Sequence, residues 1–192
     1  MPGYRSPLVG AQIDGTAVTN TTTETTLLPA VAKVFIPSGY INSTAKVFCV
    51  SASGRISNIV TTPGTLTLKF KLGPTANIAV ATSQAIQLNA IAKTNVTWVA
   101  ELMLYVRSIG SGTAATLFPV GFFKSEAVVG SALPSAGGAG DTMFQASAPA
   151  VGTGFDSSVS NQIDLTATFS IANAGNSIQL HTFTLEDLTT TP

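Results

Sequence analysis

Charged side chains are scarce in this sequence. Asp, Glu, Lys and Arg make up 9% of the 192 residues, against about 25% in an average soluble domain. Neutral residues must therefore supply most of the polar surface, and the chain contains 27 Thr and 18 Ser. Short neutral side chains are cheaper to remove from water than full charges are. The composition favours a surface largely covered by protein partners over the alternative, a Thr-rich exported surface protein.

Cysteine and histidine occur once each, as Cys49 and His181. A single cysteine excludes an internal disulfide, and a structural metal site needs several Cys or His ligands. A nucleophilic site built on a histidine would have to use His181, which falls inside an expected strand. No phosphate-binding glycine motif and no calcium-loop spacing of aspartates occurs. We predict a protein that is not an enzyme and has no catalytic residue, metal or cofactor.

Long apolar runs are also missing. No stretch approaches 18 consecutive apolar residues, and no basic start leads into an apolar segment at the N-terminus. The first observation argues against a membrane-spanning helix, and the second against a secretory signal. Lys and Arg are dispersed and not clustered, which argues against nucleic-acid binding. We expect synthesis and folding in a cytoplasm, with neither a membrane nor a nucleic acid as partner.

The few charges are divided by sign along the chain. Residues 1–124 contain nine basic and three acidic groups, whereas residues 125–192 contain six acidic groups and no basic one. Two interpretations stay open. The two halves interleave in space and compensate each other, or the subunit is dipolar and its copies meet head to tail.

Alternation of apolar and polar residues predicts β-strands along most of the chain. In residues 65–72, Leu and Phe at the even positions alternate with Thr and Lys, which places one set in the core. Residues 96–106 and 163–171 show the same period. Weaker strands are expected at 27–36, 45–51, 55–60, 78–81, 85–88, 116–123 and 177–188, the last with a bulge near His181 and Thr182. This pattern predicts an all-β, two-sheet antiparallel sandwich with jelly-roll topology, with an open barrel as the alternative.

The composition of residues 1–25 predicts an extended N-terminal arm, which precedes a single sandwich domain at 26–192. The arm is rich in Gly and Thr and lacks a core-forming period. We predict that the sandwich folds without it and that the arm orders on a partner surface. Its candidate partner contacts are Tyr4, Arg5, Leu8, Val9 and Ile13.

Residues 129–161 predict a long loop rich in Gly, Ala and Ser. Loops of this length in compact domains are uncommon unless they have a function. Phe144 and Phe155 stand isolated in this segment, and both are candidate partner contacts.

The expected strand at 96–106 has a second face that is too apolar for contact with water alone. This face combines Val99, Met103 and Tyr105 with the charged Glu101 and Arg107. Partial cover by a loop or a neighbouring subunit would explain such a pattern. We therefore predict a homo-oligomer, specifically a trimer, in which Val99, Met103 and Tyr105 are contacts.

The segment 97–110 (TWVAELMLYVRSIG), in a charge-poor, Thr/Ala/Gly-rich chain with an N-terminal arm, resembles tailed-bacteriophage virion structural proteins. It is similar in particular to jelly-roll capsid cement or decoration proteins. The resemblance implies a virion protein that stabilises the head lattice through contacts with the major capsid protein. The alternative is a phage tail or fibre protein that attaches to a host receptor or glycan. A bacterial adhesion subunit is a third class, and it would normally have a signal peptide.

Overall fold

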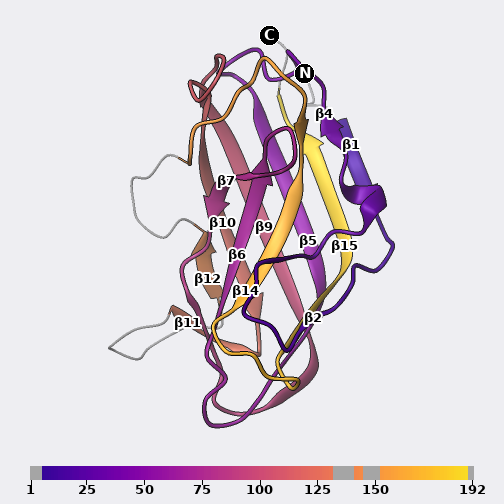
Figure 1. Cartoon of the computed structure of the whole chain (residues 1–192), viewed down its shortest axis with the longest axis vertical. Coiled ribbons are helices and arrows are strands. Elements are labelled where there is room, and N and C mark those ends of the chain that lie inside the picture. The colour runs from indigo at the N-terminus through magenta and orange to yellow at the C-terminus, as the bar shows by residue number, and fades with distance from the viewer. Residues whose placement is uncertain (1–5, 132–140, 145–151, 190–192) are drawn as a thin grey trace.

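The computed structural model describes residues 6–131, 141–144 and 152–189. These residues form two antiparallel β-sheets packed face to face (Figure 1), so the predicted two-sheet sandwich is confirmed. Within the described ranges no helix has the length and hydrophobicity needed to cross a membrane. The arm residues Tyr4 and Arg5 lie outside the described residues.

The first sheet has the strand order β1-β15-β5-β9-β10-β12, and β2 pairs with β15. Its strands are β1 (Ser6–Ala11), β2 (Val18–Thr19), β5 (Val47–Asn58), β9 (Lys93–Ser108), β10 (Thr116–Ser125), β12 (Asp141–Phe144) and β15 (Ser177–Asp187).

The second sheet has the order β11-β8-β6-β14-β3, and β7 pairs with β6. Its strands are β3 (Thr25–Thr26), β6 (Thr65–Leu72), β7 (Ile78–Thr82), β8 (Ile86–Leu88), β11 (Val128–Ser131) and β14 (Asp164–Phe169). A further short pair joins β4 (Phe35–Ile36) to β13 (Asn161–Gln162), and a single 3₁₀ turn, η1, covers Ala30–Ala32.

The main strands pair in a nested order. β5 pairs with β15, β6 with β14, β8 with β11, and β9 with β10. This nested pairing is the pattern of a long β-hairpin that is rolled upon itself. Jelly-roll folds have the same pattern of pairing. Within the first sheet, β5 stands between β15 and β9, so the β5–β15 pair and the β9–β10 pair join there.

The core lies between the two sheets and follows the alternation in the sequence. Leu66, Leu68, Phe70 and Leu72 of β6 are all buried, as their period of two predicts. The partner strand β14 places Leu165, Ala167 and Phe169 beside them. The sandwich is therefore held by a continuous apolar layer and not by cross-links.

One strand, β5, replaces the two that the sequence predicts at 45–51 and 55–60. The intervening Ser-Ala-Ser-Gly has the composition of a turn, yet it continues the ladder between β15 and β9. Gly54 is required there, because an added Cβ would lie 1.9 Å from the Gln179 carbonyl oxygen and 2.9 Å from the Trp98 indole nitrogen. That indole N–H donates to the same carbonyl at 3.0 Å. The glycine therefore marks close packing, not a chain reversal.

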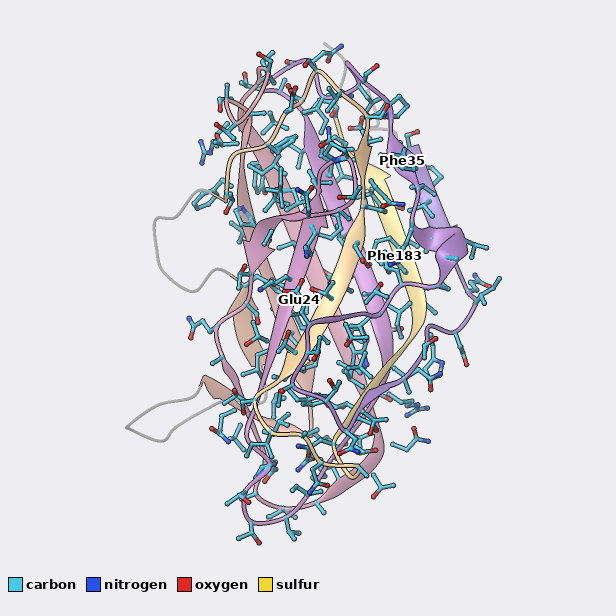
Figure 2. All side chains as sticks on the ribbon, viewed as in Figure 1. Glu24, Phe35 and Phe183 are labelled. Atoms are coloured by element: carbon cyan, nitrogen blue, oxygen red, sulfur yellow. The ribbon has the colours of Figure 1, made fainter. Side chains whose placement is uncertain are left out.

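The predicted bulge in the last strand is confirmed. The register between β15 and β5 shifts between Leu180 and Thr182, at His181. The shift lets Leu180 and Phe183, three positions apart, both face the core, where each is fully buried. Phe183 is labelled in Figure 2.

Residues 6–27, which include most of the expected arm (1–25), pair with strands of both sheets. β1 and β2 pair with β15, and β3 pairs with β14. The Leu27 N–H donates to the Leu165 carbonyl at 2.8 Å. Ala11, Val18 and Leu27 are buried. This part of the chain therefore contributes edge strands to the sandwich.

The weak strand predicted at 27–36 is corrected to the η1 turn followed by the two-residue strand β4. Pro29 occupies the position before η1, and its missing N–H interrupts a strand at that point.

The charge-sign division along the chain is compensated in space. Three ion pairs join the basic first part to the acidic last part: Lys33–Asp164 at 3.0 Å, Lys46–Asp187 at 2.7 Å and Lys93–Glu126 at 3.5 Å. The interleaved interpretation is therefore the one that the described structure supports.

Candidate functional site

The outer face of the first sheet is divided into two chemically different halves. The half over β15 and β5 exposes small hydroxyl side chains, among them Ser51, Ser53, Thr182 and Thr184, and the Ser53 and Thr182 hydroxyls hydrogen-bond at 2.6 Å. The half over β9 and β10 exposes larger apolar side chains. We call this second half the β9–β10 face; it consists of Val99, Met103, Tyr105, Phe118, Val120 and Phe122.

Antiparallel pairing brings the β9–β10 face together. Tyr105 stands opposite Phe118, and Met103 stands opposite Val120, so their side chains meet across the ladder. Val99, Tyr105 and Val120 are each 39–40% exposed. No described residue buries them, which is unusual for a contiguous apolar group on a soluble domain.

Charged groups border this face. The Arg107 guanidinium lies 5.0 Å from the centre of the Phe118 ring, and the Lys124 ammonium lies 4.9 Å from the centre of the Phe122 ring. Contacts of this kind are attractive, because the ring faces are electron-rich. Glu101 stands opposite Phe122, and among the described residues it has no ion-pair partner.

The structure brings together three of the candidate contacts predicted from sequence, Val99, Met103 and Tyr105. It adds Phe118, Val120 and Phe122 of β10, which sequence reasoning missed. Residues 116–123 are apolar at nearly every position, so their alternation does not show which phase faces outward. Only the register with β9 decides it.

The other described candidates lie elsewhere. Leu8 and Val9 of β1 are partly buried against the core, whereas Ile13 is exposed. Phe144 and Phe155 are corrected from partner contacts to core residues, because each is at most 4% exposed. Backbone bridges to Ser83 and Ala115 draw these two residues into the sandwich, so the predicted long loop is anchored at both positions.

The ionisable groups form structural networks. Burial alone would raise the pKa of Glu24, but hydrogen bonds from Lys69, Lys71 and Thr166 outweigh it and lower the pKa to about 2. Asp187 behaves similarly: burial opposes the effect, yet bonds from Lys46, Thr189 and Tyr40 lower its pKa to about 2. Burial, followed by the bond to Asp187, raises the pKa of Tyr40 to about 12.

The described residues offer few side chains from which a catalytic or metal-binding site could be built. No group of three or more His, Cys, Asp or Glu side chains gathers there. His181 Nδ1 lies 2.7 Å from an Asp14 carboxylate oxygen in an exposed position, and this pair joins the bulge of β15 to the segment after β1. Cys49 is buried.

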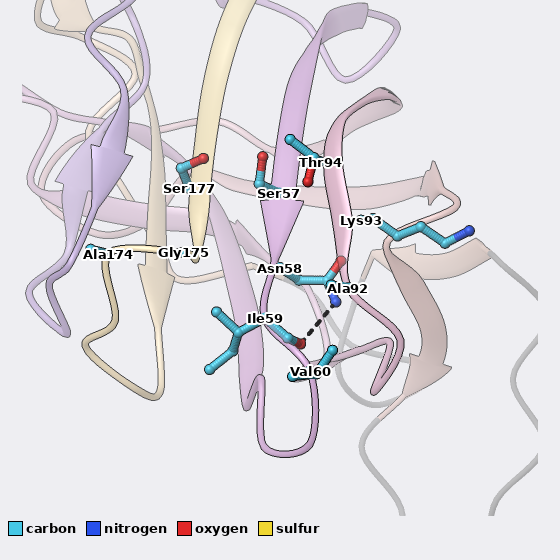
Figure 3. A pocket seen from close by; sticks show the side chains of 10 residues that line it. All are labelled: Ser57, Asn58, Ile59, Val60, Ala92, Lys93, Thr94, Ala174, Gly175 and Ser177. Atoms are coloured by element: carbon cyan, nitrogen blue, oxygen red, sulfur yellow. Dashed lines mark hydrogen bonds between the residues drawn. The ribbon is translucent and has the colours of Figure 1, made fainter.

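The described surface includes the following two hollows. One, of about 440 Å³, lies at the end of the sandwich where β5 ends and β9 and β15 begin (Figure 3). The other, of about 210 Å³, is an apolar groove between β1 and β4, lined by Leu8, Phe35 and Tyr40 among others; Phe35 is labelled in Figure 2.

No protein-family model matches this sequence, and no curated protein matches it. Among solved structures, the chain is similar to the CBM2 module of the evolved Dit of Lactobacillus casei BL23 phage J-1. The match is 12% identical, covers 82% of this chain and 69% of that chain, and has a TM-score of 0.35. At those values it supports no conclusion about function.

Proposed function

We infer that this protein is a non-enzymatic structural subunit of a bacteriophage virion and that it self-associates through the β9–β10 face. The assignment to a bacteriophage virion rests on the resemblance of the sequence to tailed-bacteriophage structural proteins. The self-association rests on one observation. The β9–β10 face is an apolar surface that no described residue covers, with Glu101, which has no ion-pair partner among the described residues, on one side of its centre and Arg107 on the other.

The positions of the charges suit a two-fold pair. On β9, Glu101 and Arg107 lie three residues to either side of position 104 and share one face. In an isologous contact, a two-fold axis across β9 at that position places Glu101 of each subunit opposite Arg107 of the other. The same operation places Met103 of each subunit opposite Tyr105 of the other, and Phe118 of each opposite Val120 of the other. The apolar centre and both rim charges are satisfied at once.

This symmetry favours a pair of subunits over the trimer predicted from sequence. An isologous patch closes on itself after two copies. A trimer would need a heterologous contact between two different patches.

A charge exchange tests the proposal. Glu101→Arg and Arg107→Glu should each place like charges opposite each other and weaken association by at least about tenfold, since like-charge contacts cost several kcal/mol. The double exchange E101R/R107E should restore association. Arg55→Glu, an exposed change on the same sheet outside the face, is the matched control. Sedimentation equilibrium measures the dissociation constant of each variant.

Equal association of all four variants, or a wild-type protein that stays monomeric at the highest soluble concentration, would exclude this face as the contact. Failure of the double exchange to restore what both single changes lose would exclude the proposed two-fold arrangement.

Within the virion, we carry forward the capsid decoration role that the sequence resemblance implies, with the major capsid protein as partner. Tail or fibre attachment to a host glycan is the second candidate. The observation that favours it is an exposed aromatic ring, Tyr105, on the same sheet face as the Ser and Thr hydroxyls of β5 and β15, since aromatic rings and hydroxyls are what a sugar surface meets. Immunogold labelling of intact particles separates the two: label spread over the head supports decoration, and label confined to the tail supports attachment.

A further inference from the structure

The first two strands of the chain are tied to a single strand of the sandwich. We call residues 6–19, which include β1 and β2, the edge segment. Within the part of the chain that the structure describes, β1 and β2 pair with β15 and with no other strand (Figure 1). Between them, the Gly15 N–H donates to the Leu180 carbonyl at 2.9 Å, and an Asp14 carboxylate oxygen lies 2.7 Å from His181 Nδ1. The edge segment therefore takes its strand pairing from one continuous stretch of chain.

The edge segment contributes little to the core. Ala11 and Val18 are buried, whereas Leu8 and Val9 are only partly buried. Detachment from β15 would expose less apolar surface than the loss of a central strand such as β6. Segments that bury few apolar side chains are among the first to open from a folded protein.

A short hinge, residues 20–23, joins the edge segment to the rest of the chain. Directly after it, Glu24 accepts hydrogen bonds from Lys69 and Lys71 of β6 at 2.7 Å each. The chain thus crosses from the first sheet to the second within the hinge. Asn20, Thr22 and Thr23 are exposed, so few contacts hold the hinge in place.

The backbone of the hinge is bent against the preferences of its residues. Asn20 has a φ of 50°, in the left-handed region that residues other than glycine adopt at a cost. The three threonines that follow are β-branched and favour extended backbone. In extended form the four residues would span roughly 13 Å. Such a hinge would carry the edge segment away from its own β15 and toward that of a neighbour.

We propose that the edge segment exchanges between copies of this chain, so that β1 and β2 of one subunit pair with β15 of another. Exchange of an identical element keeps every contact between the segment and β15, the Asp14–His181 pair included, and changes only the hinge. The hinge then gives up its left-handed residue. The partner for the β15 edge is therefore a second copy of this chain.

This contact goes beyond the proposed pairing through the β9–β10 face. β5 separates β15 from β9 in the first sheet, and the edge segment lies on the far side of β15. One subunit has room for both contacts at the same time. Exchange would then link face-to-face pairs into larger assemblies, as a structural subunit requires.

A cross-link between chains tests the exchange. Gly10 stands directly opposite Thr184 in the ladder, at a separation that a disulfide can span, and a Cβ added at Gly10 meets nothing within 4 Å. Cys49, the native cysteine, is replaced by Ala in every chain. A chain with Gly10→Cys is mixed with a chain with Thr184→Cys at the highest soluble concentration and then oxidised. We expect a covalent dimer with one chain of each kind, and mass spectrometry of its tryptic peptides should show positions 10 and 184 joined.

Two controls accompany the mixture. Ser53→Cys, on β5 of the same sheet face, replaces Thr184→Cys to measure random collision and should give little dimer. A chain with both Gly10→Cys and Thr184→Cys reports the closed form as an internal disulfide and the exchanged form as a covalent dimer.

Changes in the hinge should shift the balance between the two forms of this double variant. Deletion of residues 21–23 leaves the segment too short to return to its own β15, so the share of dimer should rise at least about fivefold. Asn20→Gly relieves the left-handed position of the closed form, so the share should fall about threefold.

An internal disulfide with no covalent dimer, in the mixture and in the hinge deletion alike, would show that the segment stays on its own chain and would overturn the proposal. A double variant that forms neither disulfide would show that β1 does not lie on β15, which overturns it equally. Glu101→Arg in all chains removes the proposed contact through the β9–β10 face. A cross-link that persists in this background supports exchange, whereas one that is lost arises from the paired faces and contradicts it.

Discussion

Phe70 is the residue on which the core of the second sheet can be tested most directly. It lies in the middle of β6, is 1% exposed and packs within the main core. Phe70→Ala should lower the free energy of unfolding by about 3–5 kcal/mol, because truncation leaves a cavity in a packed interior. Urea unfolding monitored by circular dichroism measures the change. A loss below about 1 kcal/mol would contradict the burial of this side chain.

Glu24 should give the protein a sensitivity to acid. Its carboxylate accepts hydrogen bonds from Lys69 and Lys71, each at 2.7 Å, on the outer side of the second sheet (Figure 2). Its pKa falls from 4.5 to about 2 in the folded protein. A lowered folded-state pKa stabilises the fold fully above pH 4.5, and that contribution disappears as the pH falls toward 2.

Glu24→Gln should therefore lower stability by about 1–2 kcal/mol at neutral pH, a value reduced for partial exposure. The difference between variant and wild type should shrink as the pH falls from about 5 to 2. Glu126→Gln, whose side chain is 74% exposed, is the control and should change stability little. Thermal unfolding across this pH range provides the measurement. A difference that is independent of pH would contradict the assigned ion pairs.

At the scale of elements, the N-terminal segment is the part whose role differs most between sequence and structure. The sequence predicts that the sandwich folds without residues 1–25. In the structure, β1 and β2 cover the edge of β15, and Glu24 bridges two lysines of β6. An uncovered edge exposes unpaired backbone groups and invites aggregation.

Deletion of residues 2–24 should consequently lower the midpoint of urea unfolding and promote aggregation. Deletion of residues 2–5 alone removes no described strand and should leave the midpoint unchanged. If the longer deletion unfolds at the wild-type midpoint, β1 and β2 contribute nothing to the fold, and the arm interpretation from sequence holds.

At the scale of the whole molecule, self-association should stabilise the fold by mass action. A subunit that pairs only when folded has a melting temperature that rises with protein concentration. We expect this rise for the wild type and for E101R/R107E, and a much smaller one for Glu101→Arg. Added salt should weaken the rise, because the proposed ion pairs between Glu101 and Arg107 would lie at the rim of the contact, where salt screens them. Scanning calorimetry over a hundredfold concentration range measures both effects.

The sequence by itself determined the fold class, most of the strands and much of the core. Strand β6 has the predicted bounds, and the bulge in β15 lies at the predicted place, because strict alternation reports directly which side of a strand is buried. It also identified half of the candidate face: Val99, Met103 and Tyr105 stand out because their neighbours Trp98, Leu102 and Leu104 already account for the core.

Only the tertiary structure decided the rest, and the physical reason is that those features depend on contacts between residues distant in sequence. Ser51 to Gly54 resembles a turn until the Trp98 indole, which packs against Gly54, shows why a glycine is needed in a strand. Phe118, Val120 and Phe122 face outward because of their register with β9. Phe155, isolated among glycines, is buried by a bridge to Ala115. The hollow at the end of β5 and the starts of β9 and β15 arises where three chain segments meet, and no local pattern in any one of them encodes it.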